Sequence, residues 1–587
     1  MKKKYQLIIF LVFAVLGILL LRDYSESWDE LKFYKYAGHA LESYGTWQTQ
    51  GEIIVTGGTY DNYGPAFAIF TSLTASLLHS INPNWIISDY RHLIYFLVFL
   101  AGVWAFYDIA NLWMNQTAAF VATLLLLTQP LFWGHAFFSP KDIPFMSLFL
   151  LSLAFGFRMA DSAPQASFDS LTPSAKRYFL GLSALWLVSV FSLFTFTEAF
   201  HLLIENLVRS AASGSTNIVS MIASDIHKVE PEVYIQRYFV FFLWARSIFF
   251  ILSSSILLFS ARRHLPSVFR ILPSAIILGI STSTRILGPL AGVIVVYYTL
   301  RNTGKKSIPL LAIYAVVAMI TMYITWPYLW PNPPARLLES FRVMSQYPWE
   351  GQVFYNGQYY SSTNLPLSYI PVLLAIQFTE PVWLLFAVGL FALRKNNVAL
   401  ISILLWFIMP LFALILSRAP LYDNTRQIFF ILPPIFFVAG LGVESVFGWL
   451  NQPKVKALTA FLLILPGLAA GIRLHPYEYV YYNTLAGNPD GRFEADYWAA
   501  SFREAANWLN DNAPANATVV AGDPRHILGL YLRDDLQVLT AEESVGASPD
   551  YAVFSTRYNE HEKRFIDYET VNKIERGEMM FAVIKKK

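Results

Sequence analysis

Residues 5–21, YQLIIFLVFAVLGILLL, form an unbroken apolar run that is nearly long enough to cross a lipid bilayer. A spanning helix needs roughly 20 such residues. Three lysines precede the run, and Arg22-Asp23 follow it without a small-residue cleavage site. This pattern predicts an uncleaved first span whose amino end is cytoplasmic. Apolar runs of this kind recur along the chain, so the sequence predicts a polytopic, all-α membrane protein.

The composition supports the same conclusion. The chain has 587 residues, of which 55% are hydrophobic and only 14% charged, and its mean hydropathy is +0.43. Because an ordinary soluble protein is about a quarter charged, most of this surface is not expected to face water. The net charge of +3 is too small to indicate nucleic-acid binding. The absence of cysteine excludes disulfides, thiolate nucleophiles and cysteine-ligated zinc.

We expect about thirteen transmembrane helices within a membrane domain of residues 1–472. The expected spans are residues 6–22, 91–110, 117–134, 143–160, 177–197, 236–260, 271–284, 286–300, 308–326, 376–394, 397–417, 425–447 and 455–472. Residues 65–78 are apolar but short, and we expect them to lie along the outer interface.

The tail, residues 473–587, is polar and is predicted to form a small α/β domain. It carries the turn signals NPDG and DNAP. Residues 517–521 and 551–555 have the pattern of short strands. One helical face is predicted from the spacing of Trp498, Phe502, Ala505 and Leu509.

The apolar stretch 271–300 decides the orientation of every later loop, because Arg285 interrupts it. It could be one long tilted helix or a hairpin of two short spans. The hairpin leaves seven basic residues inside and four outside, so the positive-inside rule favours it. The inside residues are then Arg301, Lys305, Lys306, Arg394, Lys395, Lys454 and Lys456, and the outside ones are Arg336, Arg342, Arg418 and Arg426. The outer loops become 23–90 and 327–369, and the tail domain becomes extracytoplasmic.

The first candidate for chemistry is the acidic pair Asp29-Glu30, a few residues beyond the first span. A hydroxyl that attacks an anomeric carbon must lose its proton, and a carboxylate just outside the membrane can accept it. The motif alone is weak, because ordinary solvated loops contain such pairs as well.

The second candidate is the segment 135–144, HAFFSPKDIP, which joins two predicted spans through a turn bounded by prolines. Asp142 lies at the edge of an apolar run, where an ionised carboxylate is costly unless it has a partner or a function. A simple ion pair with Lys141 is the alternative interpretation.

Three arginines and a set of aromatic residues are further candidates. Arg285 lies between two apolar runs and calls for an anion, which a lipid phosphate would supply; an internal ion pair or a snorkelling side chain is the alternative. Arg418 and Arg426 flank LYDN at 421–424 and could add charge to a site or pair with Asp423. The aromatic residues could stack on sugars, although an interfacial belt explains most of them. They are Trp326, Tyr328, Trp330, Tyr347, Trp349, Phe354, Tyr355, Tyr359 and Tyr360.

An ordered set of short motifs resembles a known family. Asp29-Glu30 followed by Phe33 and Ala37 resembles the acidic pair of the protein O-mannosyltransferases, and residues 140–144 resemble a second acidic site. The other matching motifs are STR at 283–285 before GP at 288–289, YDNTRQ at 422–427 before PP at 433–434, HPY at 475–477 with YN at 482–483, and DYW at 496–498. The chain resembles the bacterial branch of glycosyltransferase family 39, the phospholipid-carrier-dependent GT-C enzymes, with aminoarabinose transferases as more distant relatives.

This resemblance implies a GT-C fold and inverting transfer of a sugar from a polyprenyl-phosphate carrier at the outer face of the cell (inner or plasma) membrane. It implies Asp29 as the catalytic carboxylate, assisted by Glu30, and Asp142 as a second acidic residue. Arg285 is the implied phosphate ligand. The other candidate substrate-binding residues are Lys141, Arg426, Tyr422 and His135.

The sequence departs from the family at Lys32, where the eukaryotic mannosyltransferases carry a histidine. It also lacks their inserted soluble domain, so neither mannose nor a protein acceptor is implied; the acceptor could be a lipid, a glycan or a protein. A phosphate monoester leaving group carries less charge than a nucleotide diphosphate. We therefore expect no metal or other cofactor, although a divalent ion is compatible.

Two other classes of function remain open. A lipid or solute transporter or flippase would need ionisable residues near the membrane midplane, typically in broken helices, and Arg285 could be interpreted in that way. A non-catalytic subunit of a cell-envelope assembly would not depend on Asp29. The gathering of Asp29, Glu30 and Asp142 at one face favours the enzyme.

Overall fold

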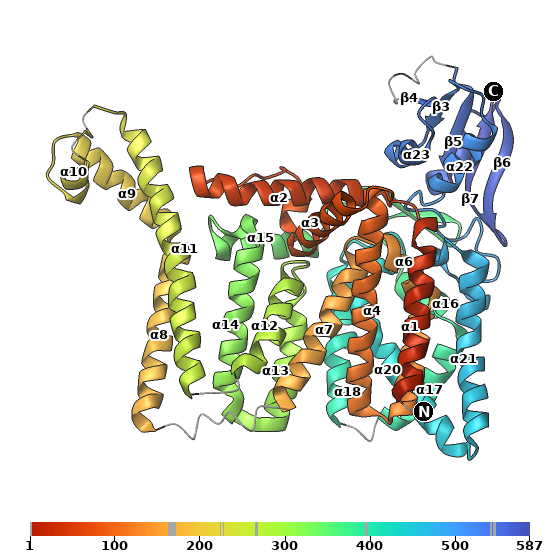
Figure 1. The fold of residues 1–587 in the computed structure, drawn as a ribbon, viewed down its shortest axis with the longest axis horizontal. Coiled ribbons are helices and arrows are strands. Elements are labelled where there is room, and N and C mark those ends of the chain that lie inside the picture. The colour runs from red at the N-terminus through yellow and green to blue at the C-terminus, as the bar shows by residue number, and fades with distance from the viewer. Residues whose placement is uncertain are drawn as a thin grey trace. The chain divides into compact units, whose positions relative to one another are not determined.

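The computed structural model describes residues 3–161, 172–223, 225–226, 228–264, 268–393, 397–539, 543 and 548–587, and it is mostly helical (Figure 1). Arg394 and Lys395, expected on the inner side, lie outside these residues. The chain divides into two compact units. The first consists of Met1–Phe33, Thr71–Ala154 and Tyr347–Lys587, and the second of Tyr34–Phe70 and Phe155–Gln346.

The predicted polytopic helical membrane protein is confirmed. Among the described residues, eight helices are long and apolar enough to cross a membrane, or up to ten if each of two bent helix pairs counts as one span. The eight are Gln6–Asp23, Ile87–Trp113, Asp142–Asp161, Lys176–Thr195, Pro231–Ser260, Pro289–Thr325, Val398–Ser417 and Pro453–Leu474. Three apolar helices are shorter, namely Ala66–Ile81, Ile271–Thr282 and Pro433–Trp449. The expected total of about thirteen spans counts such shorter helices as well and stays a prediction.

The first unit contains most of the membrane helices. Its helices are α1 (Lys3–Leu20), α4 (Ile87–Trp113), α5 (Gln116–Leu127), α6 (Pro130–Phe138), α16 (Tyr369–Gln377), α17 (Glu380–Leu393), α18 (Asn397–Ile403), α19 (Met409–Ser417), α20 (Pro433–Trp449) and α21 (Pro453–Leu474). Three helices are shared with the second unit, α2 (Glu30–Gln50), α3 (Ala66–Ile81) and α7 (Asp142–Asp161). Helices α17 and α20 pack through Gly389 and Gly442, where an added Cβ would collide with the opposite backbone. Small residues allow this close approach between apolar helices.

Two breaks in the helices of the first unit share one buried glutamine. Helices α5 and α6 are bent by 59° and α16 and α17 by 108°. Proline at position 130 lacks the N–H that would continue α5, so it starts α6 instead. The Gln129 amide donates to the Gln377 carbonyl at 2.8 Å and accepts from the Thr379 N–H at 3.3 Å. The side chain at one break thereby satisfies backbone groups exposed at the other.

The polar tail forms the predicted α/β domain, also within the first unit. Its mixed sheet has the strand order β4-β3-β5-β7-β6, and Figure 1 shows it beyond the ends of α1 and α21. Strand β3 pairs in parallel with β4 and β5, whereas β7 pairs antiparallel with β5 and β6. The strands are β3 (Thr518–Ala521), β4 (Gln537–Leu539), β5 (Tyr551–Ser555), β6 (Glu569–Arg576) and β7 (Met579–Lys586), and the helices are α22 (Phe502–Asn512), α23 (Arg525–Tyr531) and α24 (Glu560–Lys563). Phe502, Ala505 and Leu509 are buried on α22, as the helical spacing predicts, whereas Trp498, predicted for the same face, precedes the helix.

The second unit holds the remaining helices. They are α8 (Pro173–Thr195), α9 (Thr197–Ala212), α10 (Ile218–Ile222), α11 (Pro231–His264), α12 (Val268–Thr282), α13 (Pro289–Thr303), α14 (Ile308–Thr325) and α15 (Pro333–Ser345). The stretch 271–300 forms two helices, α12 and α13, rather than one long helix. Half-buried Arg285 lies in the turn between them, where its carbonyl accepts from the Gly288 N–H at 2.9 Å.

Candidate functional site

Asp29 and Lys141, two of the predicted residues, form an ion pair in the first unit. Asp29 immediately precedes α2, and Lys141 immediately precedes α7. The Asp29 Oδ2–Lys141 Nζ distance is 3.0 Å, and the Asp29 side chain is 18% exposed. An ion pair with Lys141 was the alternative interpretation of Asp142, and the structure joins Lys141 to Asp29 by an ion pair.

Arg426 joins three carboxylates. Its Nη1 atom lies 3.3 Å from Asp29 Oδ2 and 3.1 Å from Asp142 Oδ2, and its Nε and Nη2 atoms lie 3.0 and 2.7 Å from Asp423 Oδ2. The guanidinium is 3% exposed. Its planar fork of donors can serve several acceptors at once. Arg426 thus brings together Asp29 and Asp142, which are more than 100 residues apart in the chain.

Two aromatic rings flank the Arg426 guanidinium. Its Cζ atom lies 4.9 Å from the centroid of Tyr422 and 5.0 Å from that of Trp498. Tyr422 stacks on Trp349 with ring centroids 4.3 Å apart. Aromatic faces attract a cation and hold its plane in a fixed direction. Tyr422 therefore contacts the cluster through Arg426, and Trp349 of the loop 327–369 stacks on it. The predicted role of Tyr422 in substrate binding stays a prediction.

The backbone around Asp423 adopts an uncommon conformation. Asp423 and Asn424 have φ angles of +55° and +62°. Asp and Asn visit this left-handed region more readily than most residues, yet two in succession remain costly. The Asn424 side chain donates to the Tyr482 hydroxyl at 2.9 Å, which fixes the turn. Strained backbone of this kind gathers at functional sites.

The charges of the site determine the pKa of Asp29. Burial would raise this pKa, but the positive charges of Lys141 and Arg426 outweigh burial and hold it well below its usual range. Burial would likewise lower the pKa of Arg426, and the carboxylates of Asp423, Asp29 and Asp142 reverse that effect and raise it. The ion pairs of the cluster therefore favour the charged forms of Asp29 and Arg426.

Glu30 lies next to Asp29 in the sequence but has different contacts. Its Oε2 accepts from the Ser27 N–H at 2.6 Å, and its Oε1 lies 3.3 Å from His92 Nε2 on α4. An acidic residue that reaches back to the N–H three positions earlier is half of a capping box and fixes the start of a helix. Glu30 thus anchors the start of α2 to α4.

His135 is buried on α6 and fixed by two hydrogen bonds. Its Nδ1 lies 3.0 Å from the Leu131 carbonyl, which can only accept, so Nδ1 carries the proton. Its Nε2 then accepts from the Tyr497 hydroxyl at 3.1 Å. Because both ring nitrogens are engaged, His135 serves to position Tyr497, whose ring lies beside Trp498.

Arg557 extends the site from the tail domain, and no motif in the sequence indicated it. Its Nη2 donates to Asp423 Oδ1 at 3.0 Å, and its Cζ lies 4.9 Å from the centroid of Trp28. The charge of Asp423, outweighing burial, raises the Arg557 pKa. Arg285 belongs to the second unit, so its predicted place beside this cluster stays a prediction.

The motif around His475 joins the ends of α1 and α21. Burial would lower the His475 pKa, but hydrogen bonds and charges from Glu478 and Asp23 outweigh burial and raise it. Its Nδ1 lies 2.9 Å from Glu478 and its Nε2 3.0 Å from Asp23. This motif therefore has a structural role.

The pKa of His475 is higher in the folded protein than in the unfolded chain, where it is about 6.5. Charged His475 therefore stabilises the fold below this unfolded-state pKa, and the stabilisation is lost as the pH rises through the folded-state pKa. We therefore expect His475→Gln to lower the free energy of unfolding by about 1 kcal/mol at pH 5.5 and by clearly less at pH 9. Thermal unfolding of the purified protein at both pH values measures this. An equal loss at both would contradict the account.

Comparisons with known proteins add the following. No family model matches the chain, and no curated protein matches it. One similar solved structure is ArnT from Cupriavidus metallidurans in the apo state, with 14% identity, a TM-score of 0.47, and coverage of 100% of this chain and 98% of that one. The same protein bound to undecaprenyl phosphate has 13% identity and a TM-score of 0.43, with coverage of 99% of this chain and 98% of that one. An Archaeoglobus fulgidus oligosaccharyltransferase in complex with zinc and sulfate has 11% identity and a TM-score of 0.35, with coverage of 94% of this chain and 68% of that one. At these scores the similarities carry no argument about activity, and membership of glycosyltransferase family 39 stays a prediction.

Proposed function

We propose that this chain is an inverting glycosyltransferase that moves a monosaccharide from a polyprenyl-phosphate carrier to an acceptor hydroxyl at the outer face of the membrane. One observation carries the proposal: Asp29 lies 3.0 Å from Lys141 and 3.3 Å from Arg426, and Lys141 directly precedes the candidate membrane span Asp142–Asp161. The carboxylate is a base for the acceptor, and the two cations suit the phosphate of the donor.

The donor phosphate and Asp29 would use the same cation. In the structure Lys141 is paired with Asp29, and the low pKa that results makes Asp29 a weak base. A donor phosphate that attracts Lys141 would remove part of that charge from Asp29 and raise its pKa. Binding of the donor would thereby strengthen the base that the transfer step requires.

The transfer itself is a single displacement. The acceptor oxygen bonds to the anomeric carbon while its proton passes to Asp29, and the bond from that carbon to the phosphate oxygen breaks. Lys141 and Arg426 stabilise the negative charge that grows on the leaving phosphate. Asp142 and Asp423 hold Arg426 in place, and Glu30 fixes the helix that follows Asp29.

An assay with labelled donors tests this function. Purified full-length protein would be incubated with polyprenyl-phosphate sugars labelled in the sugar, together with a membrane extract. The proposal expects release of free polyprenyl phosphate and transfer of the label to a new product. Movement of intact donor between leaflets without cleavage would instead support a flippase, and absence of both would refute the enzyme.

Lys141→Met should raise the KM for the donor about tenfold or more, because a charge-assisted contact to the phosphate is lost. The variant also removes the cation that lowers the Asp29 pKa, so the acid limb of the rate profile should move to higher pH. Steady-state kinetics between pH 4 and 9 would measure both effects. Lys573→Met, on exposed strand β6, is the control. An unchanged donor KM would remove Lys141 from phosphate binding.

A further inference from the structure

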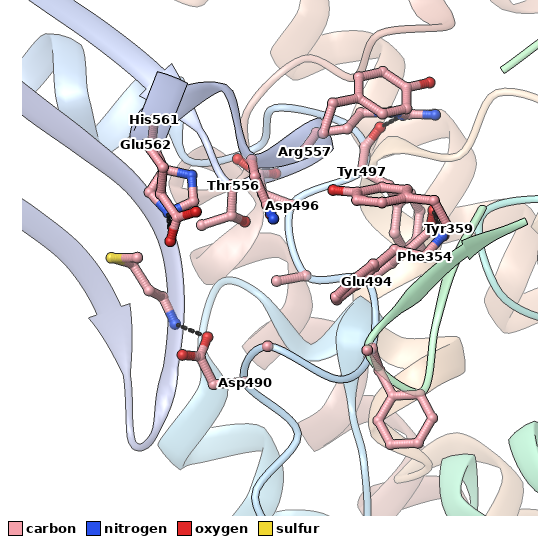
Figure 2. Close-up of a pocket in the computed structure, with 17 residues that line it drawn as sticks. Phe354, Tyr359, Asp490, Glu494, Asp496, Tyr497, Thr556, Arg557, His561 and Glu562 are labelled. Carbon is pink, nitrogen blue, oxygen red and sulfur yellow. Dashed lines mark hydrogen bonds and ion pairs between the residues drawn. The ribbon is translucent and has the colours of Figure 1, made fainter. Parts of the chain in front are cut away.

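A polar cavity of about 280 Å³ lies in the first unit, next to the charged cluster. Three segments and Met580 of β7 line it. The segments are the hairpin of β1 (Gln352–Tyr355) and β2 (Gln358–Ser361), the loop 490–497, and residues 556–562 of the tail domain. Figure 2 shows their side chains gathered around this space. Small-ligand pockets typically measure roughly 300–1,000 Å³, so the cavity suits one small group rather than a lipid chain.

Four buried polar atoms at this cavity have no hydrogen-bond partner within the described part of the chain. They are Glu494 Oε2, Thr556 Oγ1, Arg557 Nε and His561 Nδ1. Glu494 is only 8% exposed, and its other oxygen accepts from the Phe354 N–H at 3.3 Å. Buried polar atoms are nearly always paired, so this set indicates a ligand that offers both donors and acceptors.

The charges and rings of the lining indicate the chemistry of that ligand. Asp490, Asp496 and Glu562 line the cavity together with one arginine, Arg557, so anionic groups are disfavoured. The rings of Phe354 and Tyr359, 4.8 Å apart, add apolar faces. Hydroxyl groups on an otherwise neutral ring match this mixture of polar atoms without partners and apolar faces.

Burial, together with the charge of Asp423, raises the pKa of Glu494 to about 8. Its carboxyl group is therefore largely protonated at neutral pH. In that form it both donates and accepts hydrogen bonds, which a hydroxyl-bearing ligand can use.

Arg557 connects the cavity to the charged cluster. Its Nη2 donates to Asp423, which holds Arg426, and Arg557 itself lines the cavity. Tyr497 also borders the cavity and accepts a hydrogen bond from Arg557 through its carbonyl. A group in the cavity therefore lies against the same residues that hold the proposed catalytic cluster.

We infer that this cavity binds a neutral sugar residue of the acceptor, so that the acceptor is a glycan, and that Glu494, Thr556 and Arg557 hydrogen-bond its hydroxyl groups. The role of this sugar as the acceptor rests on the proposed glycosyl transfer. The binding of the sugar in the cavity does not depend on that transfer.

The first test measures binding. Saturation-transfer NMR on the full-length protein in nanodiscs would use methyl α-glucoside, methyl α-mannoside, glucuronic acid and glucose 6-phosphate as probes. At least one neutral glycoside should bind, and both anionic sugars should bind more weakly. Glu494→Leu and Thr556→Val should each weaken the binding about fivefold to tenfold, whereas Asp511→Asn, on the exposed side of α22, should not. Binding that is equal in both variants and the wild type, or absent throughout, would overturn the inference.

The second test separates the acceptor role from the chemistry. Transfer to the best-binding glycoside and hydrolysis of the donor without acceptor would be measured side by side. Glu494→Leu should raise the KM for the glycoside about tenfold, whereas Asp511→Asn should change neither this KM nor hydrolysis. An unchanged KM would refute the acceptor role. If the wild type cleaves no donor at all, the proposed function fails instead, and the binding test alone judges the cavity.

Discussion

Asp29→Asn should lower the rate of sugar transfer by about a hundredfold to ten-thousandfold while the protein stays folded. Asparagine has nearly the shape of aspartate but cannot accept the proton of the acceptor hydroxyl. It also leaves Lys141 and Arg426 in place, so the phosphate would still bind. The loss should therefore fall on kcat rather than on the KM for the donor.

Single-turnover kinetics with a labelled donor would measure this change. Asp511→Asn is the matched control, because it makes the same substitution on the exposed side of α22. It should retain the wild-type rate. Undiminished transfer by Asp29→Asn would remove Asp29 from its role as the base, and with it the proposed mechanism.

Arg426→Met should destabilise the protein by about 3–5 kcal/mol, the usual cost of breaking a buried ion pair from one side. The substitution leaves Asp29, Asp142 and Asp423 without the cation that they share. Transfer should fall below detection for the same reason. Arg426→Lys should keep the charge but lose the fork of donors, with an intermediate loss of stability.

Thermal unfolding in detergent, followed by intrinsic fluorescence, would measure the stabilities. Arg418→Met is the matched control, because Arg418 is an exposed arginine in the same loop. Its unfolding temperature should stay close to that of the wild type. The double variant Arg426→Met/Asp423→Asn should recover part of the lost stability but none of the transfer. A stable Arg426→Met variant would show that the cluster does not hold the fold together.

The apolar runs were sufficient to predict the membrane helices, because a span of about 20 residues is a local property of the sequence. The strands at 518–521 and 551–555 were likewise predicted from local patterns. The breaks at Gln129 and Gln377 were not predicted, since each depends on hydrogen bonds to the other. Proline at position 130 was the one local sign of the first break.

The candidate site was predictable only in part. Asp29, Lys141, Asp142 and Arg426 were chosen from their positions at span ends, and the structure brings them together. The role of Arg557 could not be predicted, because nothing near it in the polar tail distinguishes it from other surface arginines. Glu30 was grouped with Asp29 as its neighbour, yet the turn into α2 directs it to His92. The direction in which such a side chain points depends on tertiary packing rather than on its spacing in the sequence.

Binding of a polyprenyl phosphate without its sugar tests the central claim most directly, because it needs no acceptor and no turnover. Native mass spectrometry or calorimetry would compare the wild type with Lys141→Met and Asp29→Asn. If the lipid phosphate binds at this cluster, Lys141→Met weakens binding and Asp29→Asn tightens it, since Asp29 competes for the same cation. Equal affinities in all three proteins, or weaker binding in Asp29→Asn, would contradict the account.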